Sequence, residues 1–166
     1  TTAHTLSLHD ALPISLISAF GVGIDGIDIN LTKENQIRVT NTPGVLNDDV
    51  ADIALTLILT TNRNIINADK YARSRLWEKS PMPYGSGLAG KTLGIVGFGR
   101  IGEAVAERVL PLKLKIAYHN RTKKDSPHKY FASLIELAHN SDILLCILPG
   151  GQETERVINK IGRAHV

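Results

Sequence analysis

The feature that most constrains the fold of this chain is a set of spaced glycines directly after an apolar segment. The segment Thr92–Val96 is typical of a buried strand, and a helical pattern of apolar residues begins at Arg100. Between them the spacing is G-x-G-x-x-G: the first glycine permits a tight turn, the second lets backbone approach a diphosphate, and the third lets helix pack closely on strand. We expect a dinucleotide diphosphate on the free N–H groups at the helix start; a glycine turn without a ligand is the alternative. The turn consists of Gly97, Phe98, Gly99, Arg100, Ile101 and Gly102.

The segments after this turn alternate between helix and strand patterns. Residues 100–110 predict an amphipathic helix, residues 115–118 a second strand, residues 133–138 a short helix and residues 143–148 a third, apolar strand. This alternation predicts an α/β fold with a doubly wound parallel sheet, the NAD(P)-binding Rossmann arrangement. Cys146 is expected to be a small apolar residue on the third strand, which is predicted to be buried.

The first half of the chain shows a different order of elements. A short apolar run over residues 16–20 stops at a glycine turn, and a polar helix over residues 28–36 precedes a short strand over residues 37–40. From Val50 the apolar residues follow helical spacing, and additional apolar positions widen the stripe, so we expect this helix to pack on two sides. Prolines and glycines over residues 80–87 indicate a linker.

Composition and charge exclude several classes of protein. The chain is 43% hydrophobic and 21% charged, which is typical of a globular domain and excludes a disordered or collagen-like chain. A formal net charge of +3 gives no indication of nucleic acid as a partner. A single cysteine excludes a disulfide scaffold and fits a reducing compartment, and no apolar stretch is long enough to cross a membrane.

One short DNA word accounts for residues near both ends of the chain. The word GCTCTTCCGATC encodes Ala-Leu-Pro-Ile, found at residues 11–14. Its reverse complement, read as ATCGGAAGAGC, encodes Ile-Gly-Arg-Ala, found at residues 161–164; the alternative is that two short matches arose by chance. The word resembles a common sequencing adapter. We therefore expect residues 1–15 and 161–166 to be adapter-derived and to lie outside the fold.

The end of the second strand favours one dinucleotide over the other. NAD-binding domains place a carboxylate near this point to accept hydrogen bonds from the adenosine ribose, whereas this chain has no acidic residue there before Asp125. Arginine binds a 2′-phosphate through paired hydrogen bonds, and neighbouring amide, hydroxyl and ammonium groups add donors. The sequence therefore predicts NADP(H) in preference to NAD(H), with Asn120, Arg121 and Thr122 at the 2′-phosphate and Lys123 or Lys124 adding charge.

The motifs occur in an order that resembles the D-isomer-specific 2-hydroxy acid dehydrogenases over residues 16–160. Among them, the chain is most similar to NADP-preferring glyoxylate, hydroxypyruvate and hydroxyphenylpyruvate reductases. The motifs are Gly21-Val22-Gly23-Ile24-Asp25, Asn41-Thr42-Pro43-Gly44-Val45, Val50-Ala51-Asp52, Arg73 with Trp77, the segment from Leu88 to Gly97, Gly99-Arg100-Ile101-Gly102, and Ser141-Asp142.

The resemblance implies roles for several positions. Val22 and Gly23 match the loop whose N–H groups hold the substrate carboxylate, residues 98–101 match the diphosphate-binding segment, and residues 120–122 match the 2′-phosphate site. It also implies a division of the chain: residues 16–44 as the tail of a flavodoxin-like substrate domain, residues 45–87 as helices between domains and at a homodimer contact, and residues 88–160 as the first half only of the dinucleotide domain.

The resemblance also implies that this chain lacks the catalytic groups. The family's catalytic Arg, Glu and His lie beyond Asn159, so none of the chain's residues is assigned as catalytic, and no metal site is predicted. His119, His128 and His139 are expected to be surface or hydrogen-bonded histidines. Three departures from the family pattern are Asp52 in place of Glu, Arg75 in place of Gly, and Gly150-Gly151 after Pro149.

The function implied is that of a fragment of a cytoplasmic, homodimeric oxidoreductase that reduces a small 2-keto acid to the D-2-hydroxy acid with NADPH. The fragment alone is expected to be inactive. One alternative is a dinucleotide-sensing corepressor of the same fold, although such relatives keep an acidic strand end. Another is an unrelated Rossmann enzyme such as a ketol-acid reductoisomerase, which leaves the motifs near Gly21 and Pro43 unexplained.

Overall fold

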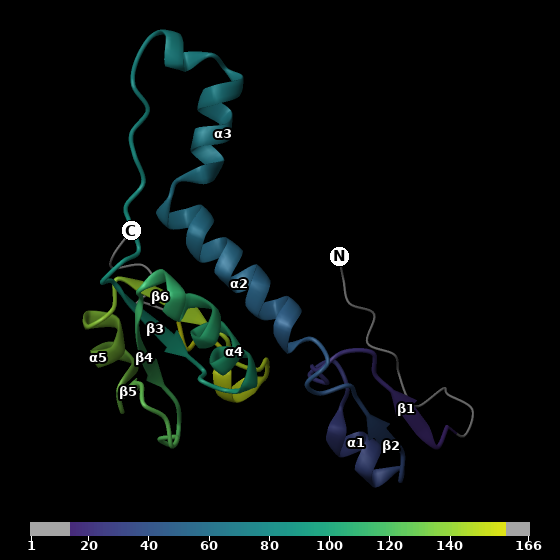
Figure 1. The fold of residues 1–166 in the computed structure, drawn as a ribbon. Coiled ribbons are helices and arrows are strands. Elements are labelled where there is room, and N and C mark those ends of the chain that lie inside the picture. The colour runs from purple at the N-terminus through teal and green to yellow at the C-terminus, as the bar shows by residue number, and fades with distance from the viewer. Residues whose placement is uncertain (1–13, 159–166) are drawn as a thin grey trace. The chain divides into compact units, whose positions relative to one another are not determined.

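The computed structural model describes residues 14–158, which form two compact units (Figure 1). One unit contains residues 14–46 and 149–157, and the other contains residues 47–148 together with Ile158. The predicted adapter-derived ends lie outside the described residues except for Ile14 and Ser15. The carbonyl oxygen of Ser15 accepts a hydrogen bond of 3.0 Å from the N–H of Arg38.

The smaller unit is built on a pair of parallel strands. Strand β1 (Leu16–Ser18) leads through helix α1 (Ile29–Glu34) to strand β2 (Arg38–Thr40), and Leu16 pairs with Arg38. Helix α1 begins where Asp28 caps it, because one carboxylate oxygen of Asp28 accepts hydrogen bonds of 3.0 Å from two N–H groups of the first turn. After the last strand of the larger unit, the chain returns to the smaller unit and forms the short 3₁₀ helix η4 (Gln152–Thr154).

The larger unit contains a four-stranded parallel sheet in the order β5-β4-β3-β6. The strands are β3 (Thr92–Val96), β4 (Lys115–His119), β5 (Lys129–Tyr130) and β6 (Ile143–Cys146). Helix α4 (Arg100–Val109) and the 3₁₀ helix η3 (Leu110–Leu112) connect β3 to β4, and helix α5 (Leu134–His139) connects β5 to β6. The prediction of an α/β fold with a parallel sheet is confirmed.

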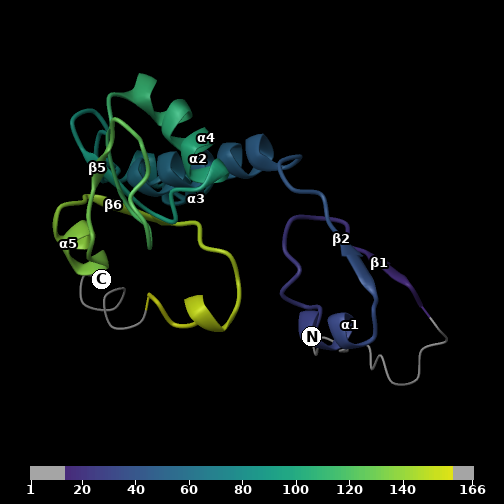
Figure 2. The ribbon, with the colours of Figure 1, turned by 90° about the horizontal axis from the view of Figure 1, so that it is seen from below.

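Helices cover both faces of this sheet, as Figures 1 and 2 show. Alternate residues of β3 divide between the faces, since Leu93 and Ile95 pack with helices α2 and α4 while Val96 packs with Leu137 of α5. Leu93, Ile95 and Leu137 have no exposed surface. The glycine turn therefore projects from the carboxyl end of a strand that is buried on both faces.

Helix α2 (Asn47–Asn62) packs along α4 and keeps an apolar face exposed. Ala51 and Ile58 are buried against the core, whereas Ile53 is 62% exposed and Leu57 is 58% exposed. The helix begins three residues before the first residue of the predicted apolar pattern, because Asn47 to Asp49 form its first turn. Among the described residues the helix packs on one side only, so the packing of its second apolar side stays a prediction.

The segment after α2 leads back to the sheet. Helix α3 (Ile65–Arg73) and the 3₁₀ helix η2 (Leu76–Glu78) follow, and the predicted linker over residues 80–87 contains no helix or strand. The linker is hydrogen-bonded to the end of α2, since the N–H of Ser86 donates to the carbonyl oxygen of Asn62 at 2.8 Å. None of the described helices is at once long and apolar enough to span a membrane.

The sequence analysis missed one strand of the sheet, and one prediction about the sheet is wrong. Strand β5 was not expected, because two residues are too few to show an alternating pattern. Strand β6 was expected to be buried, but Leu144 is 41% exposed and Cys146 is exposed. The six-residue helix α5 packs mainly on β3 and β4, so it leaves that face of the edge strand β6 open.

Candidate functional site

The glycine turn between β3 and α4 has the geometry that its spacing predicts. Gly97 has a φ of +96°, and a Cβ there would collide with the carbonyl oxygen of Ile147. A Cβ on Gly102 would lie 2.9 Å from the carbonyl oxygen of Gly97, so the third glycine permits the close approach of helix and strand. A Cβ on Gly99 would meet nothing within 4 Å, which leaves space above the turn.

The first turn of α4 presents N–H groups at that open space. The N–H groups of Arg100, Ile101 and Gly102 donate to no acceptor in the described part of the chain, whereas that of Glu103 donates to the carbonyl oxygen of Gly99 at 2.9 Å. Unpaired N–H groups at the positive end of a helix attract an anion. The turn therefore fits the diphosphate of a dinucleotide.

Asn120 connects the end of β4 to the glycine turn. Its side-chain oxygen accepts a hydrogen bond of 2.7 Å from the N–H of Phe98, and its amide nitrogen donates to the carbonyl oxygen of Phe98 at 3.1 Å. The N–H of Phe98 is therefore already paired, and the Phe98 ring is 1% exposed. Asn120 keeps one amide hydrogen for a ligand.

The loop after Asn120 carries the other two residues predicted at the 2′-phosphate, Arg121 and Thr122, and the two lysines of which one was predicted to add charge. Arg121, Thr122 and Lys123 are all exposed at the carboxyl end of β4. The Lys124 ammonium pairs with the Glu103 carboxylate at 2.5 Å, whereas Lys123 has no ion pair with any residue between 14 and 158. Of the two lysines considered from the sequence, Lys123 is the one whose charge is available.

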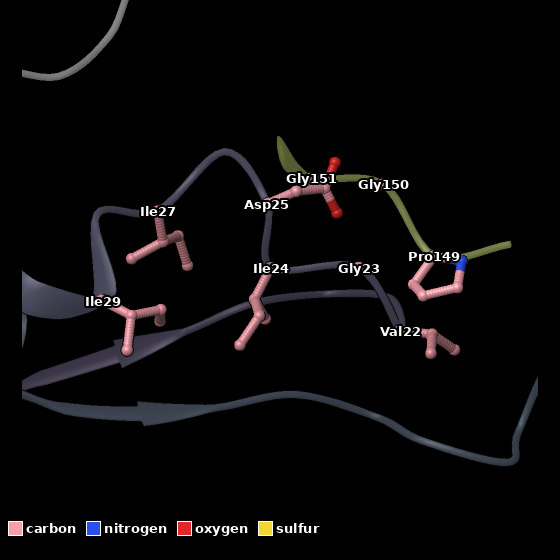
Figure 3. Close-up of a pocket in the computed structure, with 9 residues that line it drawn as sticks. All are labelled: Val22, Gly23, Ile24, Asp25, Ile27, Ile29, Pro149, Gly150 and Gly151. Carbon is pink, nitrogen blue, oxygen red and sulfur yellow. The ribbon is translucent and has the colours of Figure 1, made fainter. Parts of the chain in front are cut away.

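The loop at Val22 and Gly23 forms a pocket within the smaller unit (Figure 3). The pocket has a volume of about 410 Å³, and it is lined by the loop after β1, the start of α1 and the Pro-Gly-Gly segment after β6. The N–H groups of Val22 and Gly23 donate to no acceptor within residues 14–158. These two amides are thus available for an anionic ligand. The lining residues are Val22, Gly23, Ile24, Asp25, Ile27, Ile29, Pro149, Gly150 and Gly151.

Two side chains after β2 hold this loop through contacts that the sequence pattern did not predict. The Thr42 hydroxyl lies 3.1 Å from both the N–H and the carbonyl oxygen of Gly21, and the Asn41 amide donates to the carbonyl oxygen of Val22 at 2.9 Å. Gly21 has a φ of +127°, a conformation that side chains rarely adopt. The sequence shows only a polar pair, Asn41-Thr42, after a predicted strand, because the contacts themselves require the pairing of β1 with β2.

The histidines of the described residues make no catalytic cluster. The Nδ1 of His119 lies 3.0 Å from the carbonyl oxygen of Phe131, and His139 is exposed. His128 lies edge-on to the Phe98 ring, and burial lowers the pKa of its imidazole below the usual 6.5. Among residues 14–158, no three His, Cys, Asp or Glu side chains form a group that would hold a metal ion.

A parallel sheet with a glycine turn at the carboxyl end of an interior strand is typical of a dinucleotide-binding domain of the Rossmann type. The comparison of the sequence with known protein families also identifies a dinucleotide-binding domain. Residues 55–162 match the model of the D-isomer specific 2-hydroxyacid dehydrogenase, NAD binding domain, and the chain belongs to this family. The alternative of an unrelated Rossmann enzyme is therefore wrong.

Named relatives belong to the same family. The chain is 45% identical over 155 residues to hydroxyphenylpyruvate reductase of Plectranthus scutellarioides, covering 92% of this chain and 50% of that protein. It is 40% identical over 163 residues to a glyoxylate reductase of Thermococcus litoralis, covering 92% of this chain and 49% of the relative. The chain thus spans about half the length of the curated relatives it matches.

A solved structure of similar fold is the NADPH-dependent glyoxylate/hydroxypyruvate reductase of Sinorhizobium meliloti, in complex with NADP and malonate. Its TM-score to this chain is 0.85 at 37% sequence identity, covering 92% of this chain and 49% of that one. A protein of Thermus thermophilus gives a TM-score of 0.76 at 42% identity, covering 83% of this chain and 45% of that one.

Proposed function

We propose that this chain provides the adenosine side of an NADP(H) site in a 2-keto acid reductase. The observation that carries the proposal is the end of β4, where an exposed loop bears Arg121, Thr122 and Lys123 and no carboxylate before Asp125. A carboxylate at this point favours the free ribose hydroxyls of NAD, whereas a guanidinium favours a 2′-phosphate. The relative solved with NADP supports the same assignment.

The residues around the glycine turn also fit the diphosphate and the ribose on the adenosine side of the cofactor. The unpaired N–H groups of Arg100, Ile101 and Gly102 would hold the diphosphate, and the open space at Gly99 admits it. The bound nicotinamide would supply the hydride for the reduction of the keto group. Asn120 contributes by holding the Phe98 backbone, and its remaining amide hydrogen is available to the adenosine ribose or its phosphate.

The substrate is proposed to be a small 2-keto acid of the glyoxylate or hydroxypyruvate type. The free amides of Val22 and Gly23 at the pocket of Figure 3 would bind its carboxylate, since paired backbone N–H groups in a loop favour an anion. The names of the relatives support this substrate class. The whole enzyme is further proposed to be cytoplasmic and to form a homodimer through the exposed apolar face of α2 that carries Ile53 and Leu57.

Calorimetric titration of this chain with NADPH and NADH tests the cofactor assignment. Arg121→Ala should weaken NADPH binding by about 1.5–3 kcal/mol, the usual contribution of hydrogen bonds to a charged group, and leave NADH binding unchanged. Lys115→Ala is the matched control, because Lys115 is an exposed cation at the opposite end of the same strand. Equal losses for both cofactors in Arg121→Ala, or no preference for NADPH in the unsubstituted chain, would contradict the proposal.

A further inference from the structure

A buried tyrosine is hydrogen-bonded to the backbone at Lys124, directly after the loop residues Arg121 to Lys123. The Tyr118 side chain has no exposed surface, and its hydroxyl both accepts a hydrogen bond of 3.0 Å from the N–H of Lys124 and donates one of 3.0 Å to the Lys124 carbonyl oxygen. Both bonds join a side chain of β4 to the backbone six residues further on. The hydroxyl therefore fixes the position and the orientation of one peptide segment.

A second tyrosine hydroxyl holds the near end of the same loop. Tyr130 on β5 donates a hydrogen bond of 3.2 Å to the carbonyl oxygen of Asn120. The rings of Tyr118 and Tyr130 also lie in contact, with centroids 5.4 Å apart. Arg121 and Thr122, two of the residues predicted at the 2′-phosphate, and Lys123, predicted to add charge, thus lie between two hydrogen-bonded tyrosines of the sheet.

We propose that the hydroxyls of Tyr118 and Tyr130 are positioning groups that determine preference for the 2′-phosphate. This inference rests on the proposed NADP(H) site. Neither hydroxyl is assigned a contact with the cofactor, and the two act by holding the loop in one conformation before the phosphate arrives. Ordering an exposed loop on binding costs affinity, so a loop that is already held binds its ligand more tightly.

The effect should be confined to the 2′-phosphate, because the tyrosine rings serve a separate purpose. The Tyr118 ring stacks on the ring of Phe98, a residue of the glycine turn, at a centroid distance of 4.6 Å. This packing stabilises the turn. A phenylalanine keeps this stack and removes only the hydroxyl. The diphosphate site, which NADH and NADPH share, is then unchanged while the loop at residues 121–123 is released.

The test is calorimetric titration of the full 166-residue chain with NADPH and with NADH. Tyr118→Phe should reduce the NADPH preference about tenfold, and Tyr130→Phe about threefold because only one bond is lost. NADH affinity should stay within about twofold of the unsubstituted chain in both variants. Tyr71→Phe is the matched control, since its hydroxyl also bonds to a backbone carbonyl, that of Ser80, far from this loop in the sequence; it should leave both affinities unchanged.

The variants separate the inference from the proposed function. If Arg121→Ala abolishes the NADPH preference while Tyr118→Phe and Tyr130→Phe both keep it within twofold, the positioning role is overturned and the NADP(H) site stands. If Arg121→Ala also keeps the preference, the proposed site itself fails. Should Tyr118→Phe not fold, Tyr130→Phe decides the question alone, and an equal loss of NADH and NADPH affinity in it would show a merely structural role.

Discussion

The two units of the molecule hold their binding loops in different ways. In the unit of residues 47–148 the glycine turn stands on a strand whose Leu93 and Ile95 are fully buried. In the unit of residues 14–46 and 149–157 no described apolar side chain reaches full burial, and Thr32 is the buried residue. The loop at Val22 is instead held by polar contacts from the segment after β2.

This difference distinguishes two ways of fixing the geometry of a binding loop: packing on a buried core, and hydrogen bonds at the surface. A site on strands and helices with a packed core inherits the rigidity of that core, whereas a loop held by exposed hydrogen bonds opens at lower free energy. We therefore expect the dinucleotide turn to keep its geometry in this chain without help. The Val22 loop should depend on each of its few polar contacts.

The largest expected effect is the loss of a core side chain in the larger unit. Ile95→Ala should lower the free energy of unfolding by about 2–5 kcal/mol, because it leaves a cavity beneath the glycine turn. Ile17→Ala in β1 is the matched change in the smaller unit, and it should cost about 1 kcal/mol or less because Ile17 is only half-buried. Urea denaturation of the two variants measures both values. Similar losses would show that the units are equally well packed.

A smaller effect is expected from a methyl group in the glycine turn. Gly97→Ala should cost about 1–3 kcal/mol of stability, since alanine resists a φ of +96° and its Cβ would collide with the carbonyl oxygen of Ile147. Gly99→Ala is the control, because open space surrounds that position. It should leave the melting temperature nearly unchanged and weaken the binding of both NADH and NADPH. A Gly97→Ala variant as stable as Gly99→Ala would refute the geometry of the turn.

The polar contacts of the smaller unit should give a still smaller change in stability. Thr42→Val removes the hydroxyl that bridges the N–H and carbonyl oxygen of Gly21 and should cost about 0.5–1.5 kcal/mol. The exchange of the amides near Val22 should become faster, while that of amides in β3 should not change. Hydrogen exchange followed by mass spectrometry measures both segments in one sample. Unaltered exchange at Val22 would show that Thr42 does not hold the loop.

The smallest expected effect is a dependence of stability on pH. Burial lowers the pKa of His128 below 6.5, so the folded state binds fewer protons than the unfolded state as the pH falls through this range. The contribution of His128 to stability is therefore lost as the pH falls below about 6.5 and levels off below the folded pKa. His128→Gln should flatten the pH profile of the unfolding free energy on the acid side. An unchanged profile would assign the acid sensitivity to other groups.

The sequence was informative where local pattern determines structure. The glycine turn was predicted from the spacing of three glycines, and the helix α2 with its buried face was predicted from the spacing of its apolar residues. Both features are visible in residues that lie close together in the sequence, which is the range over which periodicity carries information.

Contacts between different helices, strands and loops could not be predicted from the spacing of residues in the sequence. Thr42 and Gly21 are 21 residues apart, and their contact requires the pairing of β1 with β2. Cys146 is exposed because the six-residue helix α5 does not cover strand β6, and the apolar sequence of β6 itself does not show this. The hydroxyl contacts of Tyr118 were missed for a related reason, because an aromatic residue in a buried strand already has a sufficient role in packing.

The most direct test of the account is a pair of NMR titrations of the ¹⁵N-labelled chain with NADP⁺ and NAD⁺. The central claim is that the turn at residues 99–102 binds the diphosphate of either cofactor, while the loop at residues 121–123 binds the 2′-phosphate. Both cofactors should therefore shift the amide signals of Gly99 to Gly102, and only NADP⁺ should shift those of Arg121 to Lys123. Equal shifts of the loop by both cofactors, or no shift at the glycine turn, would contradict the claim.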